Sequence, residues 1–292
     1  MNTLNAELLI NTGSRRGARA LPLLLDACKQ HNITVQKVHQ LKRSTDLKTT
    51  LQRIKRRRPS LLIIGGGDGT ISDAVDFLAG SKIEIGVMPL GTTNNFARSL
   101  NMPLDIDNAI RTIRTGRASG VDLGKVKNDY FVNVTGIGIS AHIAKHVSDK
   151  QKKYFGRFAY TIVGAYQLIR HKPFFVTIQD KDGELQLNFE THQVIVANGR
   201  YHAGKEIAKE AKINNRELII FALGGRSKLS FIYHTIDFYI GKRNTIKHAS
   251  YLTGRNITLH TSTPQPVELD GEVKFSTPVS INVKPGAVNI RR

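Results

Sequence analysis

The pattern of apolar and polar positions changes near residue 122. Before it, short apolar runs rich in β-branched residues alternate with segments whose apolar residues recur at helical spacing. These patterns predict strands at Glu7–Ile10, Ile33–Val38, Leu61–Ile64 and Ile83–Met88, and helices at Ala18–His31, Thr45–Arg57, Thr70–Ala79 and Asp107–Thr115. Such alternation is typical of a doubly wound, Rossmann-like α/β domain with parallel strands. We therefore predict one α/β domain over residues 1–122.

After residue 122, strand-like runs follow one another: Tyr130–Val134, Phe174–Gln179, Leu185–Phe189, Gln193–Ala197, Leu218–Leu223, Asn256–His260, Val267–Leu269 and Val279–Val283. Asp180–Gly183 has the composition of a hairpin turn. This succession predicts an antiparallel β domain over residues 123–292, a sandwich or a barrel. One helical stretch, Ala141–Arg170, carries basic and aromatic residues. It would pack on its own sheet or lie on a lipid surface.

Residues 65–70, Gly-Gly-Gly-Asp-Gly-Thr, directly follow a predicted buried strand. Glycines there let the backbone turn sharply and approach a ligand. Thr70 and Asp73 fit a capping box for the next helix, whose N-terminus favours anions. Because a carboxylate repels phosphate unless a cation lies between them, Asp68 points to Mg²⁺. A glycine-rich turn with a surface acid remains the alternative.

A second glycine loop, Pro89–Arg98, follows the next strand and offers Thr92, Asn94 and Asn95 as short polar groups. The loops at 11–17, 65–70 and 89–95 leave parallel strands at the same end, where α/β sheets bind ligands. Two such loops favour a phosphate-binding site, although helix caps have the same composition.

A third element, Val267–Val273, places Asp270 and Glu272 on either side of a glycine. Asp-Gly is typical of a turn. If this segment folds over the crevice, one of its carboxylates becomes a candidate general base.

The composition adds a strong positive charge. Lys and Arg number 43 against 23 Asp and Glu, which gives +20. This balance predicts an anionic partner, such as nucleic acid, an acidic membrane or a phosphorylated ligand. A single cysteine, Cys28, excludes an internal disulfide and fits a reducing cytoplasm. Neither a signal peptide nor a membrane-spanning run is evident, so we expect a cytoplasmic protein that meets membranes only peripherally.

The motifs at 65–70, 89–98 and 269–272, in this order over the whole chain, resemble the diacylglycerol kinase catalytic domain and its bacterial lipid kinases. The resemblance implies a fold like that of NAD kinases, with a β-sandwich after the α/β domain and the active site between them. It also implies ATP-dependent phosphoryl transfer to a lipid hydroxyl, with Mg²⁺ offsetting phosphate charge.

The resemblance also implies residue roles. Glu272 would be the base, with Asp270 and Asp68 organising the site and Asp68 near Mg²⁺. The implied nucleotide-binding positions are Asn11, Ser14, His39, Gly65, Gly66, Gly67, Asp68, Gly69, Thr70, Ile71, Gly91, Thr92 and Asn95. A structural metal site would involve Lys212, Asn215 and Glu217.

The chain departs from the family pattern at three points. Asn95 stands where the family usually has Asp, which removes a carboxylate from the expected Mg²⁺ network. His39 stands where a Thr often meets the nucleotide, and Asn215-Arg216 replaces Asp-Gly in the structural metal site. Fewer charged ligands should weaken that site.

The leading hypothesis is a lipid kinase acting at an anionic membrane surface, where each basic residue contributes about 1 kcal/mol. Diacylglycerol, phosphatidylglycerol and long-chain bases all remain open as acceptors. Three other hypotheses remain: a kinase for NAD or a soluble alcohol, a nucleotide or lipid sensor that has lost catalysis through Asn95, and a nucleic-acid-binding protein. The last rests on charge alone, since the chain shows no nucleic-acid-binding motif.

Overall fold

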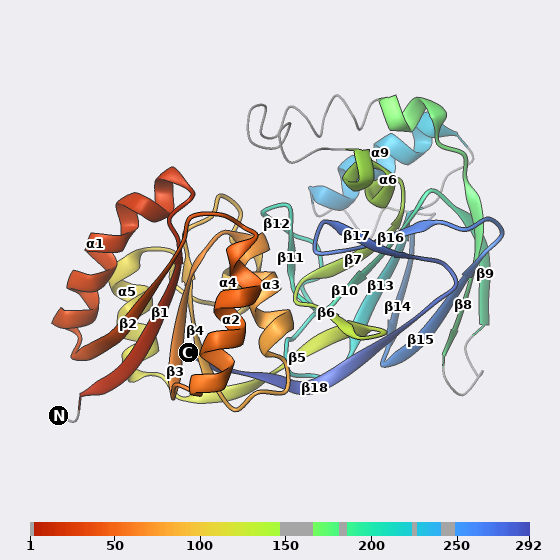
Figure 1. Ribbon diagram of the computed structural model, residues 1–292. Helices are drawn as coiled ribbons and strands as arrows, with labels where there is room; N and C mark the ends of the chain where they lie inside the picture. The colour runs from red at the N-terminus through yellow and green to blue at the C-terminus, as the bar shows by residue number, and fades with distance from the viewer. Residues whose placement is uncertain (1–2, 147–165, 181–185, 224–226, 241–248) are drawn as a thin grey trace.

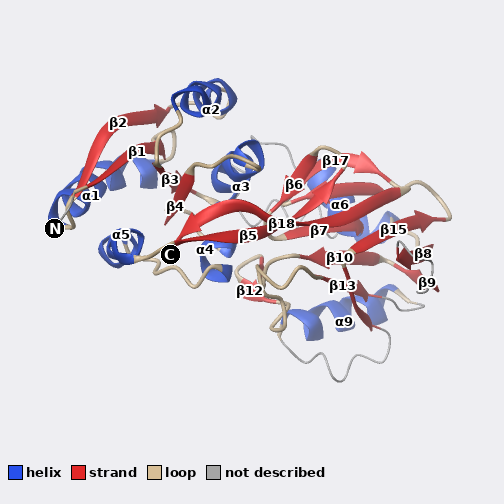
Figure 2. Cartoon of the chain, turned by 90° about the horizontal axis from the view of Figure 1, so that it is seen from below, coloured by secondary structure: helices blue, strands red, loops and turns tan. Residues whose placement is uncertain are grey.

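The computed structural model describes residues 3–146, 166–180, 186–223, 227–240 and 249–292. The N-terminal elements are β1 (Leu4–Asn11), α1 (Arg15–Gln30), β2 (Ile33–Leu41), α2 (Asp46–Arg57), β3 (Leu61–Gly66), α3 (Asp68–Leu78), β4 (Glu84–Pro89), α4 (Asn95–Ser99), α5 (Ile106–Thr115) and β5 (Ala118–Val126). Strands β2-β1-β3-β4 are parallel neighbours in that order. Helices α1 and α5 cover one face of this sheet, and α2 and α3 cover the other (Figure 2). The predicted α/β architecture is confirmed.

The second half is antiparallel β structure. Its elements are β6 (Asp129–Phe131), β7 (Val134–Gly138), α6 (Ile139–His146), β8 (Phe174–Asp180), β9 (Gln186–Thr191), β10 (Gln193–Ala197), β11 (Tyr201–His202), β12 (Lys205–Glu206), β13 (Leu218–Leu223), α9 (Lys228–Tyr239), β14 (Ala249–Gly254), β15 (Asn256–Thr261), β16 (Pro266–Leu269), β17 (Glu272–Ser276) and β18 (Val279–Arg291). The order β14-β13-β10-β7-β16-β17 forms one sheet. Its inner face packs on β8, β15 and β18 through an apolar core, so the domain is a sandwich.

The last strand joins the two halves. β18 pairs antiparallel with β15 near Ile281 and parallel with β4 at Asn289 and Ile290. One sheet therefore runs through both halves, and the C-terminus lies on the α/β half (Figure 1). The apolar pattern predicted only Val279–Val283 as strand. The pairing of β18 with β5 runs from Ile281 to Lys284, is interrupted at residues 285–287, and resumes at Val288.

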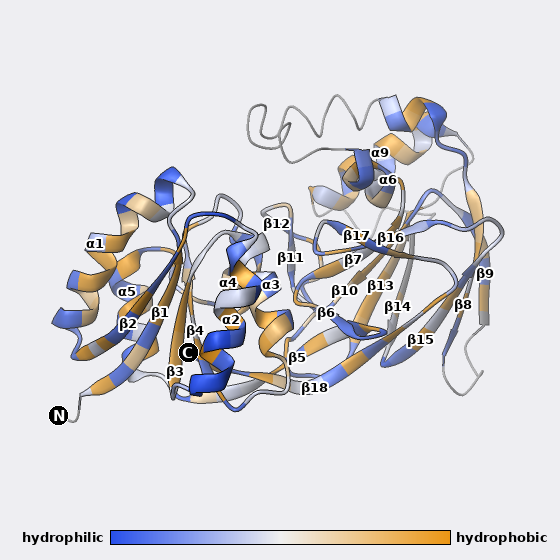
Figure 3. Ribbon diagram, in the orientation of Figure 1, coloured by the Kyte–Doolittle hydropathy of each residue, from blue (hydrophilic) through white to orange (hydrophobic). Residues whose placement is uncertain are grey.

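Hydrophobic residues occupy much of the strands in both halves, whereas α2 is largely hydrophilic (Figure 3). Strand β3 is buried at every residue, as expected for a strand covered on both faces. The outer face of the second sheet packs under α6 and α9. None of the helices among the described residues is both long and apolar enough to cross a bilayer.

Several local predictions need correction. Helix α3 begins at Asp68 with Gly67 as its N-cap, so Thr70 lies inside the first turn and makes no capping box. The run predicted as one strand at Tyr130–Val134 forms two strands, β6 and β7. Helix α9 was not predicted. Most of the predicted helix at 141–170 and part of the turn at 180–183 lie outside the described residues.

Candidate active site

Asp68 fastens the two glycine loops to each other. Its Oδ2 accepts a hydrogen bond from Thr93 Oγ1 at 2.5 Å, and its Oδ1 accepts one from the Asn95 backbone N–H at 2.6 Å. Because Asp68 is the first residue of α3, its negative charge also lies where the helix dipole favours an anion. Its carboxylate thus sets the distance between the loops that follow β3 and β4.

The backbones of these loops touch at two glycines. A Cβ placed on Gly91 would lie 2.8 Å from the Cα of Gly67 and 2.8 Å from Asn94 Oδ1. Asn94 adopts a left-handed conformation, and its Oδ1 accepts the Gly91 N–H at 2.8 Å. By contrast, a Cβ on Gly69 would meet no atom within 4 Å. The start of α3 therefore opens onto free space in which phosphate oxygens can approach its N–H groups.

The loop after β1 closes the same end of the sheet. Asn11 Nδ2 donates to Thr70 Oγ1 at 3.0 Å, and Arg16 Nη1 donates to the Gly91 carbonyl at 2.5 Å. Ser14 caps α1 by accepting the Gly17 N–H at 3.0 Å. The structure thus brings Asn11 to the glycine loops and adds Arg16, a cation absent from the predicted site.

The other residues predicted to bind the nucleotide differ in their exposure and in their hydrogen bonds. Gly65 and Gly66 end strand β3, where Gly66 accepts the Leu90 N–H at 2.9 Å. Thr92 is exposed on the second loop. The side chain of Ile71 is fully buried and its N–H bonds to the Gly67 carbonyl, so it supports the loop from behind.

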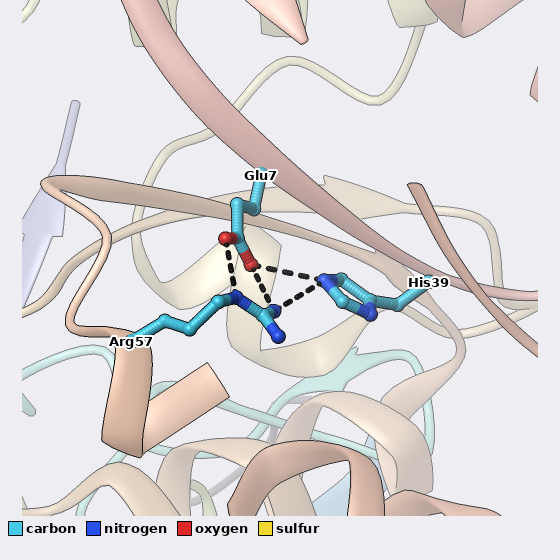
Figure 4. A network of polar contacts seen from close by, with 3 residues as sticks. All are labelled: Glu7, His39 and Arg57. Atoms are coloured by element: carbon cyan, nitrogen blue, oxygen red, sulfur yellow. Dashed lines mark hydrogen bonds and ion pairs between the residues drawn. The ribbon is translucent and has the colours of Figure 1, made fainter. Parts of the chain in front are cut away.

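His39 belongs to a separate polar cluster on β1, β2 and α2 (Figure 4). Its Nε2 lies 2.9 Å from Glu7 Oε2, which also accepts Arg57 Nη2 at 2.7 Å. The Arg57 guanidinium holds the pKa of Glu7 below its usual value, whereas burial lowers the pKa of His39. The structure does not bring His39 into contact with the glycine loops.

Asp270 joins the late motif to both halves of the protein. Its carboxylate accepts hydrogen bonds from Ser72 Oγ of α3 at 2.5 Å and from the N–H groups of Val132, Asn133 and Val134 at 2.7–3.0 Å. Because these N–H groups donate to Asp270, the predicted single strand is divided into β6 and β7. Asp270 therefore positions the β16–β17 turn against α3.

Glu272 lines a small groove that also contains Gly69 of the first loop. Asp73 of α3 and Lys274 of β17 share this groove. Burial, with the Glu272 carboxylate second, raises the pKa of Asp73 to about 6. The third motif thus meets the start of α3 despite roughly 200 residues of separation.

Asn95 connects the loops to the β half. Its Oδ1 accepts the Gly204 N–H at 2.9 Å, in the turn between β11 and β12. His202 of the same hairpin lines a cavity of about 310 Å³. The other described residues lining this cavity are Val134, Ile139, Ser140, Ile143, Leu168, Gln193, Ile195, Leu223, Phe231, Ile232, Thr235, Ile236, Tyr239 and Glu268. A largely apolar cavity therefore begins beside the glycine loops and extends under α6 and α9.

The cavity contains a buried acid that sequence reasoning missed. Glu268 is 3% exposed, and burial raises its pKa to about 8, with Asp270 adding to the effect. Its neighbour Leu269 pairs with Glu272 and lines the small groove. Because successive residues of a strand point to opposite faces, Glu268 and Glu272 lie on opposite faces of the sheet. Its position between the apolar residues Val267 and Leu269, within a predicted strand, was the sequence signal that could have identified Glu268.

The residues predicted to bind metal ions differ in how well their surroundings suit that role. Among the described residues, no group of three His, Cys, Asp or Glu side chains is arranged to hold a metal. Mg²⁺ commonly uses one or two carboxylates together with substrate phosphates, so Asp68 fits an ion that arrives with a nucleotide. At the predicted structural metal site, the Lys212 carbonyl accepts a hydrogen bond from the Asn215 N–H, and Asn215 Oδ1 accepts one from the Glu217 N–H. Glu217 Oε1 lies 3.9 Å from Arg255 Nη2.

Two family models cover nearly the entire chain. The diacylglycerol kinase catalytic domain matches residues 5–126, and the YegS C-terminal NAD kinase beta sandwich-like domain matches residues 133–292. The chain belongs to the diacylglycerol kinase family of lipid kinases. The resemblance predicted from the three motifs is therefore confirmed.

Individual relatives agree with this assignment. A diacylglycerol kinase of Bacillus subtilis is 30% identical over 219 residues, covering 74% of this chain and 72% of its own. The solved structure of a diacylglycerol kinase from Bacillus anthracis has the same fold as this chain, with a TM-score of 0.75 and 22% sequence identity. The match covers 99% of this chain and 97% of the Bacillus anthracis chain. Yeast NADH kinase bound to NADH shares the fold more distantly, with a TM-score of 0.52 and 12% identity over 100% of this chain and 83% of its own.

Proposed function

We propose that this protein transfers the γ-phosphate of ATP to the hydroxyl of a lipid. The observation that carries the proposal is the largely apolar cavity, whose lining includes His202 of the hairpin that contacts the second glycine loop. Cavities of this size and character hold apolar small molecules. A site that accepted only a soluble alcohol would have no use for so much apolar lining.

In this proposal the N-terminal domain, residues 1–122, binds the nucleotide and residues 123–292 bind the lipid. The N–H groups at the start of α3 and the two glycine loops hold the phosphates, with Asn11, Ser14 and Thr92 at the border. Asp68 would hold a Mg²⁺ ion together with the phosphates, and the ion would offset the charge that develops in phosphoryl transfer.

We assign the general base to Glu272. It lines the groove with Gly69, where the phosphates would lie, and Asp270 fixes the turn that carries it. The acceptor hydroxyl loses its proton to the Glu272 carboxylate as its oxygen bonds to the γ-phosphorus and the bond from phosphorus to ADP breaks. Asp73, Asp76 and Asp270 add their carboxyl groups to the same groove.

We also propose that the β half meets an anionic membrane through α9. Leu229, Tyr233 and Ile236 are 79%, 62% and 56% exposed along this helix, and Ile236 also lines the cavity. Apolar side chains around a lipid cavity favour insertion into the bilayer, and the charge of +20 favours anionic lipids. The lipid would then enter the cavity directly from the membrane.

The test is labelled-phosphate transfer from ATP and Mg²⁺ into a total lipid extract, compared with NAD and with soluble alcohols. We expect a labelled lipid from the wild type and a loss of about 10²- to 10⁴-fold with Glu272→Gln. Phosphorylation of NAD or a soluble alcohol without any lipid product would contradict the proposal. Full activity of Glu272→Gln would contradict the assignment of the base alone.

A further inference from the structure

A second cavity lies at the other end of the strands that carry the glycine loops. Its volume is about 480 Å³. The described residues that line it are Lys55, Arg58, Pro59, Ser60, Ser81, Lys82 and Ile83, from the connections that precede β3 and β4. The glycine loops follow the opposite, carboxyl ends of these strands. The six residues of β3, at about 3.3 Å each, place the cavity roughly 20 Å from the loops, so it is separate from the candidate active site.

The lining of this second cavity is strongly basic. Lys55, Arg58 and Lys82 bring three cations to it, two serines add hydroxyl groups, and none of the described lining residues is acidic. Glu84, which begins β4 next to the lining, is held instead by Arg291, at 2.8 Å. Cations that are held near one another repel, and an anion placed between them relieves that repulsion.

The electrostatics of a helix end do not account for this cluster. Lys55 lies in the last turn of α2, where the helix dipole favours a cation. Its Nζ donates to the Phe77 carbonyl of α3 at 3.2 Å and lies 5.3 Å from the centre of the Phe77 ring. An ammonium has three N–H donors, so this bond fixes Lys55 without using all of them. Lys82 belongs to no helix, so the two lysines converge on the cavity from different elements.

Arg58 adopts a backbone conformation that favours glycine. It ends α2 with φ of 53° and ψ of 54°, in the left-handed region. A residue with a Cβ is strained there, and glycine is the residue that most often ends a helix in this way. Arginine at this position therefore costs stability while it supplies a cation to the cavity. Local strain of this kind is characteristic of functional sites.

We propose that this cavity binds a small soluble molecule that carries two or more phosphate groups. Ammonium and guanidinium groups form charge-assisted hydrogen bonds with phosphate oxygens, and three of them suit an anion of more than one charge. A volume of about 480 Å³ lies in the range of cavities that hold small molecules and is more than one phosphate needs. This site goes beyond the proposed kinase function and does not depend on it.

A lipid headgroup would present phosphate from a membrane. Figure 1 shows the amino ends of β3 and β4 at the bottom of the molecule and α9 at the top. A membrane met through α9 would therefore lie away from this cavity, which favours a soluble ligand. Only this choice between the two sources rests on the proposed membrane contact.

The experiment is a calorimetric titration with inorganic pyrophosphate in about 0.15 M salt, which screens exposed charges beyond about 8 Å. The cavity variant is Lys55→Gln combined with Lys82→Gln. Its control, Lys37→Gln combined with Lys48→Gln, removes the same charge from exposed positions outside the cavity. Pyrophosphate bound at the glycine loops would be common to all forms. We expect the cavity variant to bind one pyrophosphate per chain about 100-fold more weakly than the wild type and the control.

Arg58→Gly separates binding from folding. Glycine adopts the left-handed backbone without strain, so this variant should melt at a higher temperature than the wild type. It should nevertheless bind pyrophosphate about tenfold more weakly, because one cation is gone. Weaker binding by a more stable protein excludes misfolding as the cause.

Equal pyrophosphate binding in the wild type and the cavity variant would overturn the site. Equal loss in the cavity variant and its control would also overturn it, because overall charge would then attract the anion. Co-sedimentation with phosphatidylglycerol vesicles tests the other source: vesicle binding that the cavity variant loses, without pyrophosphate binding by the wild type, would overturn the soluble ligand. A wild type that phosphorylates no lipid would contradict the proposed function alone.

Discussion

The two glycine loops and the apolar cavity under α6 and α9 lie side by side but are built differently. The loops present backbone N–H groups and short polar side chains from two contiguous segments, fastened by Asp68. The cavity collects single side chains from β7, α6, β10, β11, α9 and β16, and most of them are apolar. Contact with phosphate needs a fixed backbone, whereas contact with a lipid chain needs only shape and apolar surface. The first region should therefore tolerate change poorly and the second should adapt.

Among changes to these two regions, the largest effect should come from Gly91→Ala. The new methyl group would lie 2.8 Å from the Gly67 Cα, so the loops must separate, and a shift near 1 Å costs about 100-fold in rate. Steady-state kcat/KM for ATP checks this. Gly69→Ala is the matched control: its methyl group meets no protein atom, so it should keep the melting temperature while raising the KM for ATP. Wild-type activity of Gly91→Ala would show that the loops are not rigid.

Filling the cavity should have a smaller and more selective effect. Ile143→Trp adds bulk to the cavity wall, and we expect the KM for dioleoylglycerol to rise about tenfold, with overpacking costing 1–3 kcal/mol of stability. The KM for ATP should not change. Leu104→Trp, at a residue 41% exposed on the α/β half, serves as the control. An equal rise for dioctanoylglycerol and dioleoylglycerol would argue against chain binding there.

Membrane contact should depend on α9 rather than on exposed apolar residues in general. Leu229→Ser combined with Tyr233→Ser should weaken binding to phosphatidylglycerol vesicles about tenfold, because two apolar side chains no longer insert. Leu23→Ser, at a residue 58% exposed on α1, should have little effect. Co-sedimentation with vesicles measures both. Equal loss of vesicle binding in the two variants would contradict a specific role of α9 in membrane contact.

The smallest effect concerns stability and pH. Because the pKa of Glu268 is raised to about 8, the folded protein keeps a proton that the unfolded chain releases above its ordinary pKa of 4.5. Stability from this group is therefore lost as the pH rises from 4.5 to 8. Glu268→Gln should exceed the wild type in melting temperature by a few degrees at pH 8 and by less at pH 5. Glu190→Gln on the surface is the control. A difference in melting temperature that stays constant between pH 5 and pH 8 would contradict the raised pKa of Glu268.

The sequence predicted much of the α/β half because its signals are local. In this half, an apolar run, a glycine-rich turn and a segment with apolar residues at helical spacing follow one another within short distances. The three motifs identify the family. The errors have physical causes. Thr70 matched a capping box, but the helix begins at Asp68, whose carboxylate is taken by the second loop. The strand at 130–134 breaks because Asp270, distant in sequence, binds its N–H groups.

The sequence by itself determined the fold class, the family and the position of the two glycine loops, since each is identified by a pattern of residues along the chain. Only the tertiary structure decided where His39 lies, that Glu268 and Glu272 occupy opposite faces of one sheet, and that an apolar cavity begins beside the glycine loops. These features depend on strand register and on side chains from distant elements. Burial can raise the pKa of a glutamate only after those elements have packed around it.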